Sequence, residues 1–534
     1  MFKNKPSKIV IISALTILFL GVFLRLHKLG MQSFIADEYL GIKVATGYNK
    51  TSEWKHWDFN TNKLTNDEYT RGQVYYWQVA KVFDFMPISE ATSRLISVMW
   101  GTIAMVTVFI ITFLITQNWT IALIALFLSA VSITELMFDR KLRMYSMFAP
   151  VYLWFSYGVF RFLEYKNIFK GSPLCLKNKK EKSCFLDSIS QKTGLGWGWL
   201  TPVILLGFLS LKTHDLTVNI IPTILVYLLI VGVYLWLKQD KNSRHYLGIT
   251  ASFAVLGVLF KLVAPFVENI PVLGYFAKKV VGASSWAGSV FHWTYLEKIT
   301  LDYSYILLGI VFICIGSYLM VKKYGKIGLW TVLSFLTPLI LAIFIWKRNV
   351  GDQYIYLTQL FKVIIISCGI YFSVLKMSFA FKKRKRAFNL ILVTILFSLI
   401  NIPFFYSEIG FYQSVKNWKH SNYREVYDYF LKKKSDKAVL IARPLTNYYL
   451  KGNNVKLLGY GDSNKMTLAR VVEAQAKYDE VWAIFAKNLN ITGDARRYME
   501  DKFELRETKY TNKKVKIYVW KRGQMDSVAE QTPK

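Results

Sequence analysis

Long apolar runs constrain this chain more than any other feature of its sequence. They lie near 9–24, 95–115, 119–137, 144–163, 196–211, 216–237, 247–265, 303–321, 327–346, 354–377 and 388–406. Runs of this length suit the hydrocarbon core of a bilayer, which is about 30 Å thick. The 534 residues are 53% hydrophobic and 16% aromatic, which is too apolar for a soluble protein of this size. We therefore predict a polytopic α-helical membrane protein with about eleven spans, leaving twelve or thirteen open.

The basic residues of the predicted loops indicate the orientation of these spans. Lys and Arg number 68 against 34 Asp and Glu, a formal net charge of +34. If the chain has eleven spans, all of its basic segments lie on one face of the membrane. These segments are the N-terminal lysines (Lys3, Lys5, Lys8), 166–192, 238–244, 322–326 and 382–386. The positive-inside rule makes that face cytoplasmic. We predict a multi-pass protein of the plasma (inner) membrane, with a cytoplasmic N-terminus and an extracytoplasmic C-terminus.

The same positive charge could also indicate nucleic-acid binding. No recognition module accompanies it, however, and basic loops of membrane proteins meet anionic lipid headgroups. We therefore predict membrane lipid, and no nucleic acid, as the partner of the basic segments.

The composition changes after about residue 410. Strand-like runs lie at 438–442, 455–460, 480–485 and 515–520, with helix-like stretches at 424–433, 467–477 and 493–503. This alternation predicts a small extracytoplasmic α/β domain over 411–523, after a transmembrane domain over 1–410 and before a disordered tail over 524–534. The pattern of residues 74–82 in the first outer loop predicts an amphipathic helix that lies on the membrane. Tyr75, Tyr76 and Trp77 would then lie at the level of the lipid headgroups.

Two adjacent acids, Asp37 and Glu38, lie a few residues past the end of the first span. Charge near lipid is costly unless it has a function or a partner. In the predicted topology several polar turns share the outer face with them, and such a set could bind the phosphate of a lipid headgroup. The candidate binding residues in these turns are Arg140, Lys141, Arg143, Tyr145, His214 and Arg348.

Plain structural roles also account for these residues, and both interpretations stay open. The cations near Arg140 could snorkel to the interface, His214-Asp215 could be a capped turn, and Arg348 could be an interfacial anchor. Asp37-Glu38 could cap the helix that follows. A metal site drawing on Asp37, Glu38, Asp139 and His214 is open as well, although no spacing demands one.

Several of these motifs resemble one superfamily in their order along the chain. Arg25–Gly30 through Asp37-Glu38-Tyr39 resembles the first-loop signature of the GT-C membrane glycosyltransferases. The closer resemblance is to the protein-mannosyltransferase-like branch (glycosyltransferase family 39), which includes the aminoarabinose transferase of lipid A. The lead into the second span (89–97), Arg143–Ser146 and Thr213–Asp215 also resemble this branch.

The chain departs from the branch at two motifs. A Pro-Pro-Leu-like stretch in the first loop is replaced by 71–76, and an Arg-Tyr followed by Pro near the tenth span is replaced by 353–356. These departures bear on how the acceptor and the donor phosphate are held.

The resemblance implies transfer of a hexose or pentose from a polyprenyl-phosphate donor to a glycan, lipid or protein acceptor outside the cytoplasm, with inversion. Asp37 would be the general base, and Glu38 would place the acceptor or hold the loop. Arg143, with Lys141 and His214 or Arg348, would grip the phosphate. No cofactor is expected to be essential, and a divalent metal is left open.

The competing interpretation is a transporter or flippase of lipid-linked saccharides. A transporter would carry ionisable residues inside its spans. Most of the predicted spans lack charge at mid-depth, and the acids gather at one surface, so the sequence favours the transferase.

Overall fold

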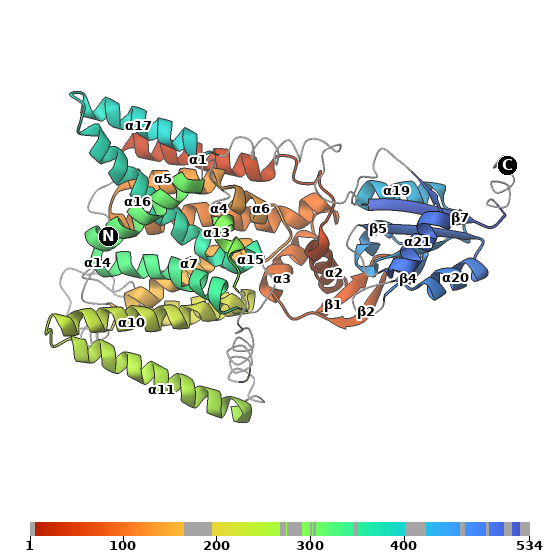
Figure 1. Ribbon diagram of the computed structural model, residues 1–534, viewed down its shortest axis with the longest axis horizontal. Helices are drawn as coiled ribbons and strands as arrows, with labels where there is room; N and C mark the ends of the chain where they lie inside the picture. Colours follow the sequence, from red (N-terminus) through yellow and green to blue (C-terminus); the bar gives the residue numbers. More distant parts are fainter. Residues whose placement is uncertain are drawn as a thin grey trace. The chain divides into compact units, whose positions relative to one another are not determined.

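The computed structural model describes residues 6–164, 195–267, 274, 291–299, 302, 306–346, 351–400, 423–459, 465–486, 491–506 and 515–523. The chain divides into two compact units (Figure 1). The helical unit comprises 1–27, 97–140 and 144–403, and the mixed unit comprises 28–96, 141–143 and 404–534. The first loop therefore groups with the C-terminal region, 300 and more residues away along the chain.

Every predicted apolar run coincides with a helix or overlaps one, which confirms a helical membrane protein. The helices are α1 (Lys8–Leu26), α4 (Glu90–Thr116), α5 (Trp119–Val131), α6 (Ile133–Asp139), α7 (Tyr145–Leu163), α9 (Leu200–Thr213), α10 (Ile220–Leu237), α11 (Ser243–Val267), α13 (Thr294–Ile299), α14 (Ile306–Phe344), α15 (Asp352–Ile355), α16 (Gln359–Ser378) and α17 (Arg384–Leu399). Short 3-10 turns at Trp197–Trp199, Asp215–Asn219 and Tyr356–Thr358 adjoin α9, α10 and α16.

Not all of these helices meet a strict test for a membrane span. Among the described residues, five are long and apolar enough to cross a membrane unaided, and the bent pair α5 and α6 would make a sixth. The count of eleven therefore stays a prediction.

Helix α14 shows why length alone undercounts the spans. Its 39 residues would extend ~58 Å at 1.5 Å per residue, about twice the bilayer core. The helix is broken at Gly325, where φ is +59° and ψ is −127°, a conformation that favours glycine. A Cβ at Gly328 would overlap the Met320 carbonyl oxygen, so a second glycine permits the same bend. The break falls between two predicted runs, at Lys322–Lys326.

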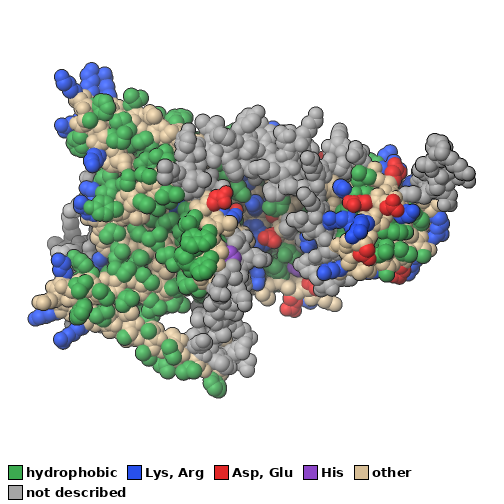
Figure 2. Space-filling model, viewed as in Figure 1, with side chains coloured by type: hydrophobic (Ala, Val, Ile, Leu, Met, Phe, Trp, Pro, Cys, Tyr) green, Lys and Arg blue, Asp and Glu red, His purple; other side chains and the backbone are tan. Residues whose placement is uncertain are grey.

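Basic side chains gather at one end of the helical unit. Figure 2 shows Lys and Arg over the α10–α11 turn, the bend of α14 and the α16–α17 turn. Lys238, Lys322 and Lys382–Arg386 are exposed there. Their shared end agrees with a single membrane face. Which face is cytoplasmic stays a prediction, and the 166–192 segment lies outside the described residues.

The mixed unit begins with the first loop. It holds α2 (Ala36–Thr51), an antiparallel hairpin of β1 (Lys55–Asp58) and β2 (Lys63–Glu68), and α3 (Gln73–Val82). The hairpin was not predicted from the sequence. Helix α3 was predicted, but the placement of two of its three aromatics was wrong, because Tyr75 and Tyr76 are fully buried rather than at the lipid headgroups, whereas Trp77 is exposed. Helix α2 packs on α3 and covers them, since Gly41 lets the Tyr76 ring approach the backbone.

The C-terminal part of the mixed unit is an α/β layer, as predicted. Its elements are α19 (Tyr423–Lys433), β3 (Val439–Ala442), the 3-10 helix η6 (Pro444–Leu450), β4 (Lys456–Gly459), α20 (Leu468–Lys477), β5 (Glu480–Ala486), α21 (Gly493–Lys502), β6 (Glu504–Leu505) and β7 (Val515–Lys521). The strand order is β4-β3-β5-β7-β6, with β3 parallel to β4 and β5, and β7 antiparallel to β5 and β6. Strand β3 is buried along its whole length, as expected of a central parallel strand. The domain boundaries at 410 and 523 stay predictions.

We predict that Gly101→Val destabilises the helical unit. A Cβ on Gly101 of α4 would overlap the Asp139 carboxyl group, which is fully buried. Such overpacking costs about 1–3 kcal/mol, so the melting temperature in detergent should fall. Gly257→Val on α11 is the matched control, because a Cβ added there would meet no atom within 4 Å. Equal melting temperatures for the two variants would contradict this prediction.

Candidate functional site

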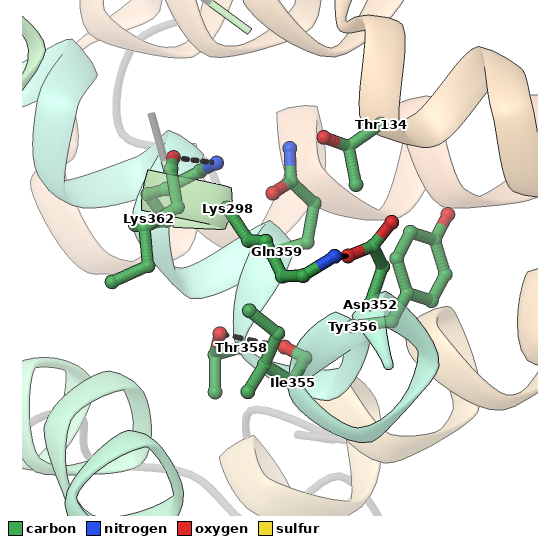
Figure 3. Close-up of a pocket in the computed structure, with 9 residues that line it drawn as sticks. Thr134, Lys298, Asp352, Ile355, Tyr356, Thr358, Gln359 and Lys362 are labelled. Carbon is green, nitrogen blue, oxygen red and sulfur yellow. Dashed lines mark hydrogen bonds and ion pairs between the residues drawn. The ribbon is translucent and has the colours of Figure 1, made fainter. Parts of the chain in front are cut away.

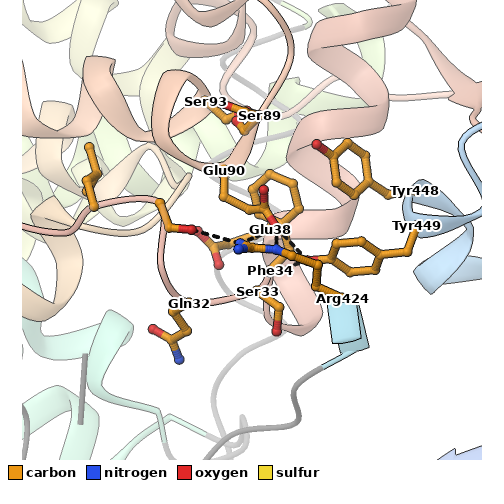
Figure 4. Close-up of polar contacts among 12 residues, drawn as sticks. Gln32, Ser33, Phe34, Glu38, Ser89, Glu90, Ser93, Arg424, Tyr448 and Tyr449 are labelled. Carbon is orange, nitrogen blue, oxygen red and sulfur yellow. Dashed lines mark hydrogen bonds and ion pairs between the residues drawn. The ribbon is translucent and has the colours of Figure 1, made fainter. Parts of the chain in front are cut away.

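A buried ion pair joins Glu38, which is labelled in Figure 4, to Arg94. Arg94 Nε donates to Glu38 Oε1 and Nη2 to Oε2, both at 2.8 Å. Glu38 is in the first turn of α2, where its Oε2 also accepts the backbone N–H of Ile35 at 3.1 Å. Arg94 is in the second turn of α4. The two-pronged geometry fits a planar guanidinium against a carboxylate.

The pair joins three segments of the mixed unit. Arg94 Nη1 donates to the carbonyls of Leu29 and Gln32, each at 2.9 Å. Glu38 Oε1 accepts the backbone N–H of Leu142 at 2.7 Å, which holds the short 141–143 turn. Burial opposes ionisation of Glu38, but the Arg94 charge and the N–H donors outweigh it and lower the pKa of this carboxyl. Glu38 is therefore ionised, and both of its carboxylate oxygens accept hydrogen bonds from protein groups. This suits the loop-holding role, one of the two that the sequence left open.

Asp37, one residue earlier, points outward. Its side chain is 59% exposed, and its Oδ2 lies 3.4 Å from Nη2 of Arg143, whose side chain is 14% exposed. Helix α2 can approach the 141–143 turn closely because residue 41 is glycine: a Cβ there would meet Leu142 at 3.2 Å. The structure thus brings Asp37 and Arg143 together as the sequence predicted, and Lys141 lies in the same turn.

A second polar cluster supports the loop before α2 (Figure 4). Arg424 Nη2 lies 2.6 Å from Glu90 Oε1, and the Tyr449 hydroxyl donates to the same oxygen at 3.0 Å. The Tyr449 oxygen in turn accepts the backbone N–H of Phe34 at 2.8 Å. This cluster was not predicted from the sequence. The spacing of Glu90 and Arg94, one helical turn apart at the start of a span, was the only local signal for it.

Three predicted binding residues fall in the helical unit. His214 Nδ1 accepts the backbone N–H of Leu216 at 3.0 Å, and its ring lies 5.0 Å from that of Tyr145. His214 thus caps a turn, one of the two roles considered. Arg140 Nη1 donates to the carbonyls of Leu24, Arg25 and His27 at 2.8, 3.0 and 2.8 Å, which closes the C-terminal end of α1. Arg348 lies outside the described residues.

The helical unit also carries a polar pocket that was not predicted from the sequence (Figure 3). It is lined by Thr134, Lys298, Ile299, Asp352, Ile355, Tyr356, Thr358, Gln359 and Lys362. Lys298 pairs with Asp352, and Lys362 pairs with the buried Asp302 at 3.1 Å. Each lysine has an acidic partner, so the charges of these pairs cancel. The pocket therefore carries paired charges on a lining that includes Ile299 and Ile355, and it is not a strong anion site.

Among the described residues, no three His, Cys, Asp or Glu side chains are grouped so as to hold a metal ion. The four residues that the sequence offered as metal ligands are therefore not assembled into a site in this part of the chain. Metal dependence stays untested.

Comparison with known proteins identifies the fold. No protein-family model matches the chain, and no curated protein matches it in sequence. Among solved structures, ArnT from Cupriavidus metallidurans bound to undecaprenyl phosphate is similar at a TM-score of 0.54 and 10% identity, covering 95% of this chain and 97% of that one.

The oligosaccharyltransferase of Archaeoglobus fulgidus, tethered with an acceptor peptide containing the NVT sequon, is similar at a TM-score of 0.52 and 11% identity. That match covers 91% of this chain and 69% of the other. The archaeal oligosaccharyltransferase AglB of the same organism, in complex with an inhibitory peptide and a dolichol-phosphate, is similar at 0.51 and 10% identity, covering 89% and 69%. The chain therefore shares its fold with these structures, in agreement with the GT-C fold expected from the sequence motifs.

We predict different effects on stability from the two adjacent acids. Glu38→Gln leaves Arg94 buried without its charge partner and should cost about 3–5 kcal/mol. Asp37→Asn changes an exposed side chain and should stay within about 0.5 kcal/mol of wild type. Thermal unfolding of purified protein in detergent measures both, with Glu53→Gln as a control at another exposed acid. A stable Glu38→Gln protein would refute the anchoring role.

Proposed function

We propose that this protein is a membrane glycosyltransferase that moves a sugar from a polyprenyl-phosphate donor to an acceptor hydroxyl or amide, with Asp37 as general base. One observation carries the proposal. An exposed carboxylate, Asp37, and a guanidinium, Arg143, face each other on two segments that the buried Glu38–Arg94 pair fixes in place. The GT-C fold makes glycosyl transfer the chemistry to which this pairing is best suited.

The reaction needs a base and a stabiliser of negative charge. The acceptor oxygen or nitrogen attacks the anomeric carbon while its proton passes to the Asp37 carboxylate. The bond from that carbon to the phosphate oxygen breaks, and its electron pair leaves with the lipid phosphate. Attack opposite the leaving group inverts the anomeric centre. The phosphate gains charge as it departs, and a guanidinium stabilises it through paired N–H donors.

Arg143 suits this role because it is a partly exposed cation beside the base. Without donor, Asp37 and Arg143 neutralise each other. A bound phosphate would compete for the guanidinium and leave the Asp37 carboxylate available for the acceptor proton. Lys141 adds a positive charge in the same turn. Tyr145, His214 and Arg348 stay predictions from the sequence as donor-binding residues.

The donor class is proposed from the fold neighbours. One of them is bound to undecaprenyl phosphate and another is in complex with a dolichol-phosphate. A polyprenyl-phosphate-linked hexose or pentose is therefore the donor that we propose for this chain, with the reaction at the extracytoplasmic membrane surface. The acceptor stays open between glycan, lipid and protein.

The buried charges of the helical unit favour a second candidate, a transporter of lipid-linked saccharides. Arg25 pairs with Asp139 at 2.8 Å, and both side chains are fully buried. These charges lie at the ends of α1 and α6 and are paired, whereas a transport route needs charge along the spans. We therefore rank transport second.

We predict that Asp37→Asn abolishes transfer while the donor still binds. Loss of a general base typically costs 10²–10⁴-fold in rate. The assay follows loss of labelled sugar from undecaprenyl-phosphate mannose, glucose, galactose and arabinose, presented to purified protein with a cell-envelope extract. A turnover near that of wild type would refute the assignment of Asp37. Donor binding without transfer by the wild type would favour the transporter.

We predict that Arg143→Ala mainly weakens donor binding. A hydrogen bond to a charged group contributes about 1.5–3 kcal/mol, so the KM for the donor should rise about tenfold or more. Arg143→Lys keeps the charge but loses the paired donors, and should recover part of the affinity. An unchanged donor KM and rate in Arg143→Ala would contradict the phosphate contact.

A further inference from the structure

We propose that the C-terminal α/β domain is a positioning clamp for the loop that carries Asp37, and that Arg424 and Tyr449 are its positioning residues. This inference rests on the proposed function, because it assigns a role to residues that act on the base through others. It also gives the soluble domain a defined task at the site.

Arg424 makes the first contact. It lies in the first turn of α19 and its side chain is 28% exposed. Its Nε and Nη2 both donate to Glu90 Oε1, at 2.8 and 2.6 Å, and Nη2 also donates to the carbonyl of Gly30 at 2.7 Å. One guanidinium thus holds the start of α4 and the beginning of the loop before α2.

Tyr449 makes the second contact from η6. Its ring is 1% exposed, and its hydroxyl joins Glu90 Oε1 to the backbone N–H of Phe34. Phe34 is itself fully buried, with its ring 4.9 Å from that of Tyr448. The loop is therefore held three residues before Asp37 by groups of the C-terminal domain.

Charge links the clamp to the anchor of Asp37. Along this cluster the charges alternate: Arg424 pairs with Glu90, and Arg94 pairs with Glu38. Glu90 and Arg94 are one turn apart on α4 and attract each other. If Arg424 lost its charge, Glu90 would compete with Glu38 for Arg94. That competition would loosen the start of α2 and displace Asp37.

Several further hydrogen bonds to main-chain groups join the C-terminal domain to the first loop. Asn60 exchanges two hydrogen bonds of 2.8 Å with the main chain of Val455, and the Gly452 N–H donates to the Phe59 carbonyl at 2.7 Å. Lys43 Nζ donates to the Pro444 carbonyl at 2.7 Å. These contacts keep the domain docked when a single clamp residue is changed, so the effect of the clamp can be measured in a folded protein.

The test compares Arg424→Gln, Arg424→Lys and Tyr449→Phe with Arg497→Gln, an exposed control on α21. Amide hydrogen exchange of 28–38, measured by mass spectrometry on full-length protein in detergent, should quicken about tenfold in Arg424→Gln and Tyr449→Phe. The strands β3 and β5 should keep their protection. With the undecaprenyl-phosphate donors above, kcat should fall tenfold to a hundredfold at an unchanged donor KM, as expected for a displaced catalytic group. Arg424→Lys should recover part of kcat.

Each outcome supports or overturns the clamp. Faster exchange in 28–38 with wild-type kcat would overturn the positioning role, and so would unchanged exchange. A parallel loss of protection in β3 and β5 would mean that the residues only stabilise the domain. If the wild type transferred no sugar from any donor, the proposed function would fall, whereas a wild type that transfers beside an equally active Arg424→Gln would overturn the clamp alone.

Discussion

The buried pair of Glu38 and Arg94 fixes the geometry on which the candidate site depends. Removing two ions from water costs several kcal/mol for each, and only good geometry with further hydrogen bonds offsets that cost. Here the guanidinium also meets the carbonyls of Leu29 and Gln32, and the carboxylate also meets the N–H groups of Ile35 and Leu142. These contacts tie the loop, the start of α4 and the 141–143 turn to one another, so any displacement of one segment would leave buried polar groups without partners.

Helix geometry gives the adjacent carboxylates of Asp37 and Glu38 different surroundings and therefore different roles. Consecutive residues of an α-helix point about 100° apart, so adjacent acids cannot share one environment. The Glu38 side chain points inward and forms an ion pair with Arg94, whereas the Asp37 side chain points outward and is 59% exposed. A fully paired acid thus supports the exposed acid that we propose as the base. This is the arrangement expected where a base must be held accurately yet remain accessible.

Sequence reasoning succeeded where the signal was local or periodic. Apolar runs located the helices, and alternating patterns located β3, β4, β5 and β7. The predicted topology put Asp37 and Arg143 on one face, and the structure has their side chains 3.4 Å apart. Sequence reasoning failed where the deciding contact joined distant parts of the chain. Arg424 and Glu90 are 334 residues apart, and the sequence around neither residue indicates that it pairs with the other. Tyr75 and Tyr76 looked like interfacial aromatics because the sequence did not show that the helix after Asp37-Glu38 packs on them. The lysines of the helical pocket were missed because their acidic partners come from other turns.

The docking of the first loop on the chain's far end has a consequence for biosynthesis. Asn60 and its partner Val455 are 395 residues apart, so the loop is made long before the segment that completes it. At 5–20 residues per second, the ribosome needs about 20–80 s to span that interval. During this time the nascent loop lacks the contacts of Arg424 and Tyr449, and only the Glu38–Arg94 pair and its partners are present to hold the segment that carries Asp37. If the proposed clamp positions the base, the chain would reach its full activity only after its last domain has been synthesised.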